Sequence, residues 1–361
     1  MMIPDRMEPV PLAAVVPGLP LGPLPKGPWT ASRLARWCAA QQNWDRIHYD
    51  QAYARDQAGL AERVVNGALK QHLLVQLLDG CFGGVARIAR LAYRFTGPDF
   101  VGESLVVHGR VRSVDAVDGG RVLIRVDLGI RNVERDRDTT TGSATLVACA
   151  DRAVTDDDLG ALPASERLDE SVRPALGPVP AAIAALLGTE FESITSAVPL
   201  ELGRLYLFAD AVGDLDPAYH APGGGRPATA PPLFPIHALQ QRPGTLPLSD
   251  RPEAMGREGV SEAGRNFGRR FGLPDRGAVN GGNDAEIHSL LAVGETVQAS
   301  SRLLGASVKT GSQGAPMLLT TVLNTYRTTS GRLLLRERHT SIFRSVEPSA
   351  GVGNQPAPAT A

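Results

Sequence analysis

The stretch GALKQHLLVQLLDGC, residues 67–81, decides the fold of this chain. Its apolar side chains recur three and four residues apart, which is the spacing of one face of a helix. They fall on nearly every turn, at Leu69, Leu73, Leu74, Leu77, Leu78 and Cys81. A helix on a protein surface has a single apolar stripe, so we expect a helix this apolar to lie inside a sheet. The stretch therefore predicts a buried helix that begins at Gly67.

Four segments after this helix have the composition of strands, namely residues 85–96, 101–116, 120–131 and 141–150. Gly119-Gly120 separates two of them and is typical of a hairpin turn. A long buried helix followed by an antiparallel sheet is the element order of a hot-dog fold, in which the sheet wraps around the helix. We therefore expect residues 29–150 to form one hot-dog domain.

The second half of the chain repeats this plan. Strand-like segments occur at residues 188–198, 283–289, 294–308, 316–328 and 332–345. Val101-Gly102-Glu103 and Val293-Gly294-Glu295 each open a long strand, which is a short internal echo between the halves. Residues 221–232 are mostly Pro, Gly and Ala, so the second central helix must be shortened or replaced by loop. We expect an α+β double hot dog, with two antiparallel sheets side by side, each wrapped around a helix, and residues 179–345 as a degenerate partner domain.

Three further segments lie outside the two domains. Residues 1–28 are rich in proline and predict an extended N-terminal arm. Residues 151–178 are polar, contain several prolines and an acidic run, and predict a linker. Residues 346–361 consist of small residues and proline and predict a disordered tail.

The charges of the chain nearly balance, because 37 lysines and arginines face 38 aspartates and glutamates. This balance argues against nucleic acid or an anionic membrane surface as the main partner. The cysteines Cys38, Cys81 and Cys149 have no paired spacing, so neither a disulfide framework nor a zinc site is indicated. No stretch approaches the length of a membrane span, and residues 1–28 lack a signal-peptide pattern. We expect a cytoplasmic protein without a membrane span or a bound metal.

A polar loop and the start of the buried helix carry the candidate chemistry. The segment Asn43-Trp44-Asp45-Arg46-Ile47-His48-Tyr49-Asp50 packs a histidine, two carboxylates, an amide and a tyrosine into eight positions. The segment Val64-Val65-Asn66-Gly67-Ala68-Leu69 follows at a distance that allows it to fold back onto this loop. We interpret the two segments as one active site.

Together with Phe100-Val101-Gly102-Glu103, these segments resemble the MaoC-like hot-dog hydratases and dehydratases. That family includes (R)-specific enoyl-CoA hydratases and 3-hydroxyacyl-thioester dehydratases, and its motif places an acidic residue five positions before a histidine. On this sequence His48 takes the histidine position, Asn43 the acidic position and Asp45 the position of the motif's asparagine.

The second half contains a copy of the same motif at residues 213–219. There Asp214 takes the acidic position and Tyr219 the histidine position. Because a tyrosine replaces the histidine, a structural role is favoured for this copy.

The resemblance implies the reversible hydration of a 2-enoyl thioester, or the dehydration of a 3-hydroxyacyl thioester, without a cofactor. The substrate would be carried on coenzyme A or on an acyl carrier protein, as in fatty acid metabolism. A neutral histidine can take and give the proton, and an amide or carboxylate beside it can hold the water. The first amides of a buried helix can stabilise charge on the thioester oxygen, and a glycine there allows close approach.

These roles assign His48 as the general acid and base, and the Gly67 amide as a donor to the thioester oxygen. Either Asn43 or Asp45 holds the water, and Asn43 is favoured by the five-residue spacing of the motif. We expect the substrate to be contacted by Tyr49, Asn66, Ala68 and Tyr219.

Two alternatives stay open from the sequence. A hot-dog acyl-CoA thioesterase would depend on a carboxylate of the buried helix, such as Asp79. A non-catalytic acyl-thioester-binding partner subunit is plausible because Asn43 cannot act as a base. In each case the chain could also form a homodimer.

Overall fold

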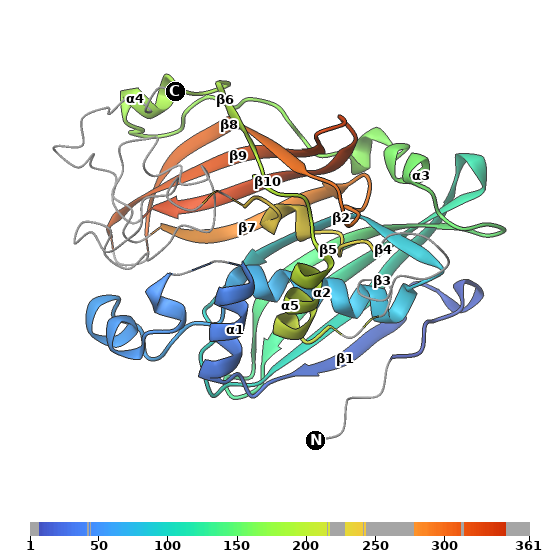
Figure 1. Cartoon of the computed structure of the whole chain (residues 1–361), viewed down its shortest axis with the longest axis horizontal. Helices are drawn as coiled ribbons and strands as arrows, with labels where there is room; N and C mark the ends of the chain where they lie inside the picture. The colour runs from blue at the N-terminus through green and yellow to red at the C-terminus, as the bar shows by residue number, and fades with distance from the viewer. Residues whose placement is uncertain are drawn as a thin grey trace.

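The computed structural model describes residues 7–41, 43, 45–214, 216, 228–240, 242, 278–311 and 314–343. Within these residues ten strands form one antiparallel sheet in the order β1-β3-β4-β5-β2-β7-β10-β9-β8-β6 (Figure 1). The strands are β1 (Pro20–Lys26), β2 (Ala86–Phe95), β3 (Leu105–Val117), β4 (Arg121–Asn132), β5 (Arg137–Cys149), β6 (Glu190–Thr195), β7 (Ala278–Ile287), β8 (Val297–Thr310), β9 (Pro316–Thr328) and β10 (Leu333–Phe343). The helices are α1 (Ala31–Gln41), α2 (Gly67–Phe82), α3 (Asp156–Gly160), α4 (Ala181–Ala184) and α5 (Leu202–Val212).

The two halves of the sheet have the same strand topology. From the centre outward the first half runs β2-β5-β4-β3-β1, and the second runs β7-β10-β9-β8-β6. The halves join where β2 pairs with β7, from Arg90 opposite Glu286 to Arg94 opposite Gly282. The predicted double hot dog is confirmed, and the two sheets are continuous.

Helix α2 is the buried helix that the sequence predicts. Its five leucines are fully inaccessible to solvent, and each such burial stabilises the fold by roughly 1.5–3 kcal/mol. Figure 1 shows α2 lying across the strands of the first half, with α1 and α5 beside it. The N-terminus of α2 is consequently held at the edge of a dry core.

The second half differs where its central helix was expected. Residues 228–240 contain one short 3-10 helix, η7 (Phe234–His237), in which Phe234, Pro235 and Ile236 are buried. The expectation that this helix is shortened is met over these residues. Residues 217–227 and 243–277 lie outside the described part of the chain.

The predicted N-terminal arm and the predicted linker both form hydrogen bonds with the sheet. Part of the predicted arm forms the edge strand β1, which pairs with β3 and buries Leu21. The predicted linker crosses the face of the sheet opposite α2, where Arg90 donates to the carbonyls of Glu166 and Arg167. Within the described ranges, no helix has the length and apolar character needed to cross a bilayer.

The burial of α2 makes a prediction about stability. Leu77→Ala should lower the free energy of unfolding by about 2–5 kcal/mol, because it leaves a cavity in the core. Leu207→Ala is a matched control on α5, where the side chain is 64% exposed, and should change stability by no more than about 0.5 kcal/mol. Urea denaturation followed by circular dichroism measures both. Equal midpoints for the two variants would contradict the assigned core.

Candidate active site

The polar loop after α1 is shaped by its own side chains. Oδ1 of Asn43 accepts a hydrogen bond from the Asp45 backbone N–H at 3.3 Å. Asp45 then caps the short helix η2 (Arg46–His48), with Oδ1 accepting from the Ile47 N–H at 3.5 Å. Both residues that were predicted to hold the water therefore also fix the turn that presents His48.

His48 is buried and its ring is held by a backbone group. Its Nδ1 lies 2.8 Å from the carbonyl oxygen of Val64. A carbonyl oxygen only accepts, so Nδ1 donates, and the neutral ring has its basic lone pair on Nε2. The structure thus assigns the tautomer that a general base at Nε2 requires.

The segment before α2 folds back onto this loop. The Val64 N–H donates to the Ile47 carbonyl at 3.0 Å, and Val64 forms a β-bridge with Phe100. The two predicted site segments are therefore brought together, as the sequence led us to expect.

Gly67 is the first residue of α2 and lies under an aromatic ring. A Cβ atom at this position would come within 2.8 Å of Cε2 of Phe95. A side chain at this position would have to displace the Phe95 ring, and the Gly67 N–H lies at the positive end of a buried helix. Ala68 follows in the same first turn, and Tyr49 follows His48 directly at the end of η2.

Asn66, predicted to bind substrate, is fully buried beside the Cys38 thiol. Burial raises the pKa of this thiol to about 12. Cys38 therefore stays protonated at neutral pH and does not serve as a nucleophile. Tyr219, the other predicted contact, lies outside the described residues.

The second motif copies the backbone geometry of the first. The Asn43 N–H donates to the Cys38 carbonyl five residues earlier, and the Asp214 N–H donates to the Ala209 carbonyl at the same spacing, both at 2.9 Å. Oδ1 of Asp214 accepts from the Asp216 N–H at 3.0 Å, as Asn43 does from Asp45. Both turns follow helices of eleven residues, α1 and α5.

Asp79, on which the thioesterase alternative depends, lies in the last turn of α2. It is twelve residues after Gly67, which is roughly 18 Å along a helix. It is therefore at the opposite end of α2 from His48.

A buried polar cluster at the join of the two halves was not assigned from the sequence. Nε2 of His72 lies 3.0 Å from Nε2 of His237, and both lie within 3.3 Å of the Gln71 amide nitrogen. The Tyr93 hydroxyl donates to the Gln71 side-chain oxygen. Burial lowers the pKa of His72 to about 3, so this ring is neutral. A histidine and a glutamine inside an apolar helix were the only sequence signal for this cluster.

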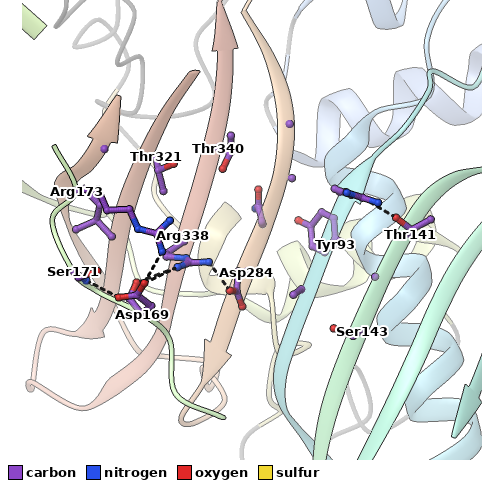
Figure 2. A pocket seen from close by; sticks show the side chains of 18 residues that line it. Tyr93, Thr141, Ser143, Asp169, Ser171, Arg173, Asp284, Thr321, Arg338 and Thr340 are labelled. Carbon is purple, nitrogen blue, oxygen red and sulfur yellow. Dashed lines mark hydrogen bonds and ion pairs between the residues drawn. The ribbon is translucent and has the colours of Figure 1, made fainter. Parts of the chain in front are cut away.

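A groove of about 540 Å³ lies on the other face of the sheet (Figure 2). It is lined by residues of the sheet, including Arg94, Arg338 and Asp284, and by Asp169, Ser171 and Arg173 of the linker. None of the described residues that were predicted for the site lines this groove. It is therefore separate from the chemistry of His48.

Comparisons with known proteins agree with this architecture. A family model described as hydroxyacyl-thioester dehydratase type 2 matches residues 26–101. A model described as FAS1-like, dehydratase domain region matches residues 185–337. No curated protein matches the chain.

Solved structures with the same fold cover nearly the whole chain. A MaoC domain protein dehydratase from Chloroflexus aurantiacus J-10-fl is 12% identical, with a TM-score of 0.63, over 94% of this chain and 98% of that one. The protein Rv0216 from Mycobacterium tuberculosis, described as having a double hotdog fold, is 14% identical with a TM-score of 0.55, over 92% and 98%. A structure described as a MaoC-like dehydratase is 14% identical with a TM-score of 0.53, over 95% and 100%. At these identities the likeness shows the fold.

The contact of Gly67 with Phe95 predicts a position-specific effect. Gly67→Ala should lower the free energy of unfolding by about 1–3 kcal/mol, because the added methyl overlaps the ring. Gly203→Ala is the matched control, since nothing lies within 4 Å of its Cβ position, and it should stabilise α5 by about 0.5–1 kcal/mol. Thermal denaturation of both variants tests this. An equal rise in melting temperature would contradict the close approach at Gly67.

The neutral His72 predicts how stability depends on pH. The ordinary pKa of 6.5 applies in the unfolded chain and the folded pKa is about 3, so the unfolded chain binds the proton more readily between these values. Stability is therefore complete above pH 6.5 and falls toward pH 3, by up to about 1.4 kcal/mol per pH unit for this group. As the pH is lowered from 6.5 toward 3, the denaturation midpoint of His72→Leu should fall less steeply than that of the wild type. His108→Gln, which replaces a half-exposed histidine, is the control. If the midpoint of His72→Leu depends on pH as steeply as that of the wild type, His72 is not held neutral in the folded protein.

Proposed function

We propose that this chain is a member of the MaoC-like hot-dog hydratase and dehydratase family and adds water reversibly to a 2-enoyl thioester at His48. The reverse reaction dehydrates a 3-hydroxyacyl thioester, and the dehydratase family models that match residues 26–101 and 185–337 support this reaction class. The observation that carries the proposal is the hydrogen bond from His48 Nδ1 to the Val64 carbonyl, since it sets the tautomer with a basic Nε2.

In the hydration direction, Nε2 of His48 removes a proton from the water as its oxygen bonds to the β-carbon. The electron pair of the α,β double bond moves toward the thioester carbonyl, and negative charge develops on its oxygen. The Gly67 N–H at the N-terminus of α2 donates to that oxygen. The proton on Nε2 then passes to the α-carbon, so that the elements of water are added and His48 returns to its neutral form.

The water is held by the turn before His48. Asn43 is favoured for this role, with Asp45 as its replacement, and both lie within the same hydrogen-bonded turn. An amide can orient a water but cannot take its proton, so proton transfer belongs to His48. We assign the contacts with the acyl thioester to Tyr49, Asn66 and Ala68, and also to Tyr219 from its motif position. The acyl group is carried on coenzyme A or on an acyl carrier protein.

A second candidate function follows from Asn43. Because this residue replaces the acid of the family motif, the chain could bind an acyl thioester without turnover, as a partner subunit. In that case Asn43→Asp would create hydratase activity that the wild type lacks. The thioesterase alternative is disfavoured by the place of Asp79 at the far end of α2.

The test is hydration of crotonyl-CoA and longer 2-enoyl-CoAs, followed as loss of the enoyl absorbance. His48→Ala should lower kcat by about 10²–10⁴-fold, which is the usual contribution of general acid–base catalysis. His108→Ala on β3 is the control and should keep full activity, because its half-exposed ring pairs with Asp138. Absence of turnover at every chain length, or a His48→Ala variant as active as the wild type, would contradict the proposal. Release of free thiol would instead identify a thioesterase.

A further inference from the structure

A buried ion pair lies beside the proposed site. Nζ of Lys70, in the first turn of α2, is 2.8 Å from Oδ2 of Asp99, and both side chains are almost completely buried. Burial lowers the pKa of Lys70, and Asp99 opposes this shift. Removing two charges from water costs much of what their attraction returns, so such a pair is weak as a source of stability. The pair does fix the relative orientation of the two segments that it joins.

The Asp99 carboxylate is fixed on every side. Besides Lys70, it accepts from the hydroxyl of Thr139 at 2.8 Å, from Nδ2 of Asn132 at 2.9 Å and from the Arg135 guanidinium at 3.1 Å. Four charge-assisted hydrogen bonds leave this carboxylate little freedom to move.

The backbone around Asp99 connects this fixed carboxylate to the segment that holds the His48 ring. Its carbonyl accepts from the Val65 N–H at 2.7 Å, and the neighbouring Phe100 forms the β-bridge to Val64. The Val64 carbonyl is the acceptor that sets the His48 tautomer. Lys70 is thus connected to His48 through three consecutive, directional contacts.

We propose that Lys70 and Asp99 are positioning residues for the proposed reaction, on which this inference rests. The pair joins the first turn of α2, which carries the Gly67 N–H, to the segment that holds the Val64 carbonyl. The Gly67 N–H, which donates to the thioester oxygen, is consequently held at a fixed distance and orientation from the basic Nε2 of His48. Neither Lys70 nor Asp99 touches the reacting atoms.

The test uses the double variant Lys70→Met/Asp99→Leu, which removes both charges and leaves neither one buried alone. The surrounding polar groups keep partners, because Asn132 and Arg135 each also donate to Glu103 at 2.9 Å. We expect kcat to fall at least tenfold with KM within threefold of the wild type, since binding is less sensitive to this geometry than the transition state is. Thr139→Val, which deletes one hydrogen bond to Asp99, should give a smaller change in the same direction and serves if the double variant does not fold.

A second readout does not depend on turnover. The ¹⁵N resonances of His48, identified by their loss in His48→Ala, report which ring nitrogen carries the proton. The wild type should show the Nδ1–H tautomer alone, and the variants should show both tautomers. Glu286→Gln is the matched control, because Glu286 is equally buried and pairs with Arg167 on the linker face. It should leave the His48 resonances unchanged.

The outcomes separate this inference from the proposed function. An unchanged His48 tautomer together with a kcat within twofold of the wild type would overturn the positioning role. If the wild type has no hydratase activity, the tautomer alone decides: a mixture in the variants supports the positioning role, and an unchanged tautomer refutes it. A mixture in Glu286→Gln as well would reduce the effect to general destabilisation and also refute it.

Discussion

The burial of α2 within the sheet is the constraint on which the rest of the structure depends. A helix whose leucines are all inaccessible must be enclosed, and its first residue, the partly buried Gly67, lies at the edge of that core. In such a setting the helix dipole is poorly screened and a developing negative charge is stabilised more strongly. In the proposed mechanism, the start of α2 supplies the donor that stabilises this charge, and the loop before it supplies the base.

The two halves share a helix and the turn after it but differ in the element that follows. In both halves an edge strand is followed by a helix of eleven residues, which leads into the same hydrogen-bonded turn, at Asn43 and at Asp214. Only in the first half does a long buried helix within the described residues follow that turn. Over residues 228–240 the second half has a short 3-10 helix, which packs its His237 against His72 of α2. The second half thereby completes the core beside the proposed site.

Much of the fold could be predicted because its signals are local. The leucine spacing of α2, the strand composition and the glycines of the β3–β4 hairpin each act within a few residues. The contacts that define the site are not local: His48 meets a carbonyl 16 residues away, Lys70 a carboxylate 29 residues away, and His72 a ring 165 residues away. A lysine in an apolar helix requires a buried partner, but this partner was not predicted, because only the folded chain brings Asp99 to Lys70.

The most direct measurement of the central claim is a crystal structure with a saturated acyl-CoA thioether bound in place of the substrate. The account predicts that the atom replacing the thioester carbonyl carbon lies next to the Gly67 N–H and that the β-carbon faces Nε2 of His48. Density for the acyl group in the groove on the linker face, or at the Asp79 end of α2, would contradict it.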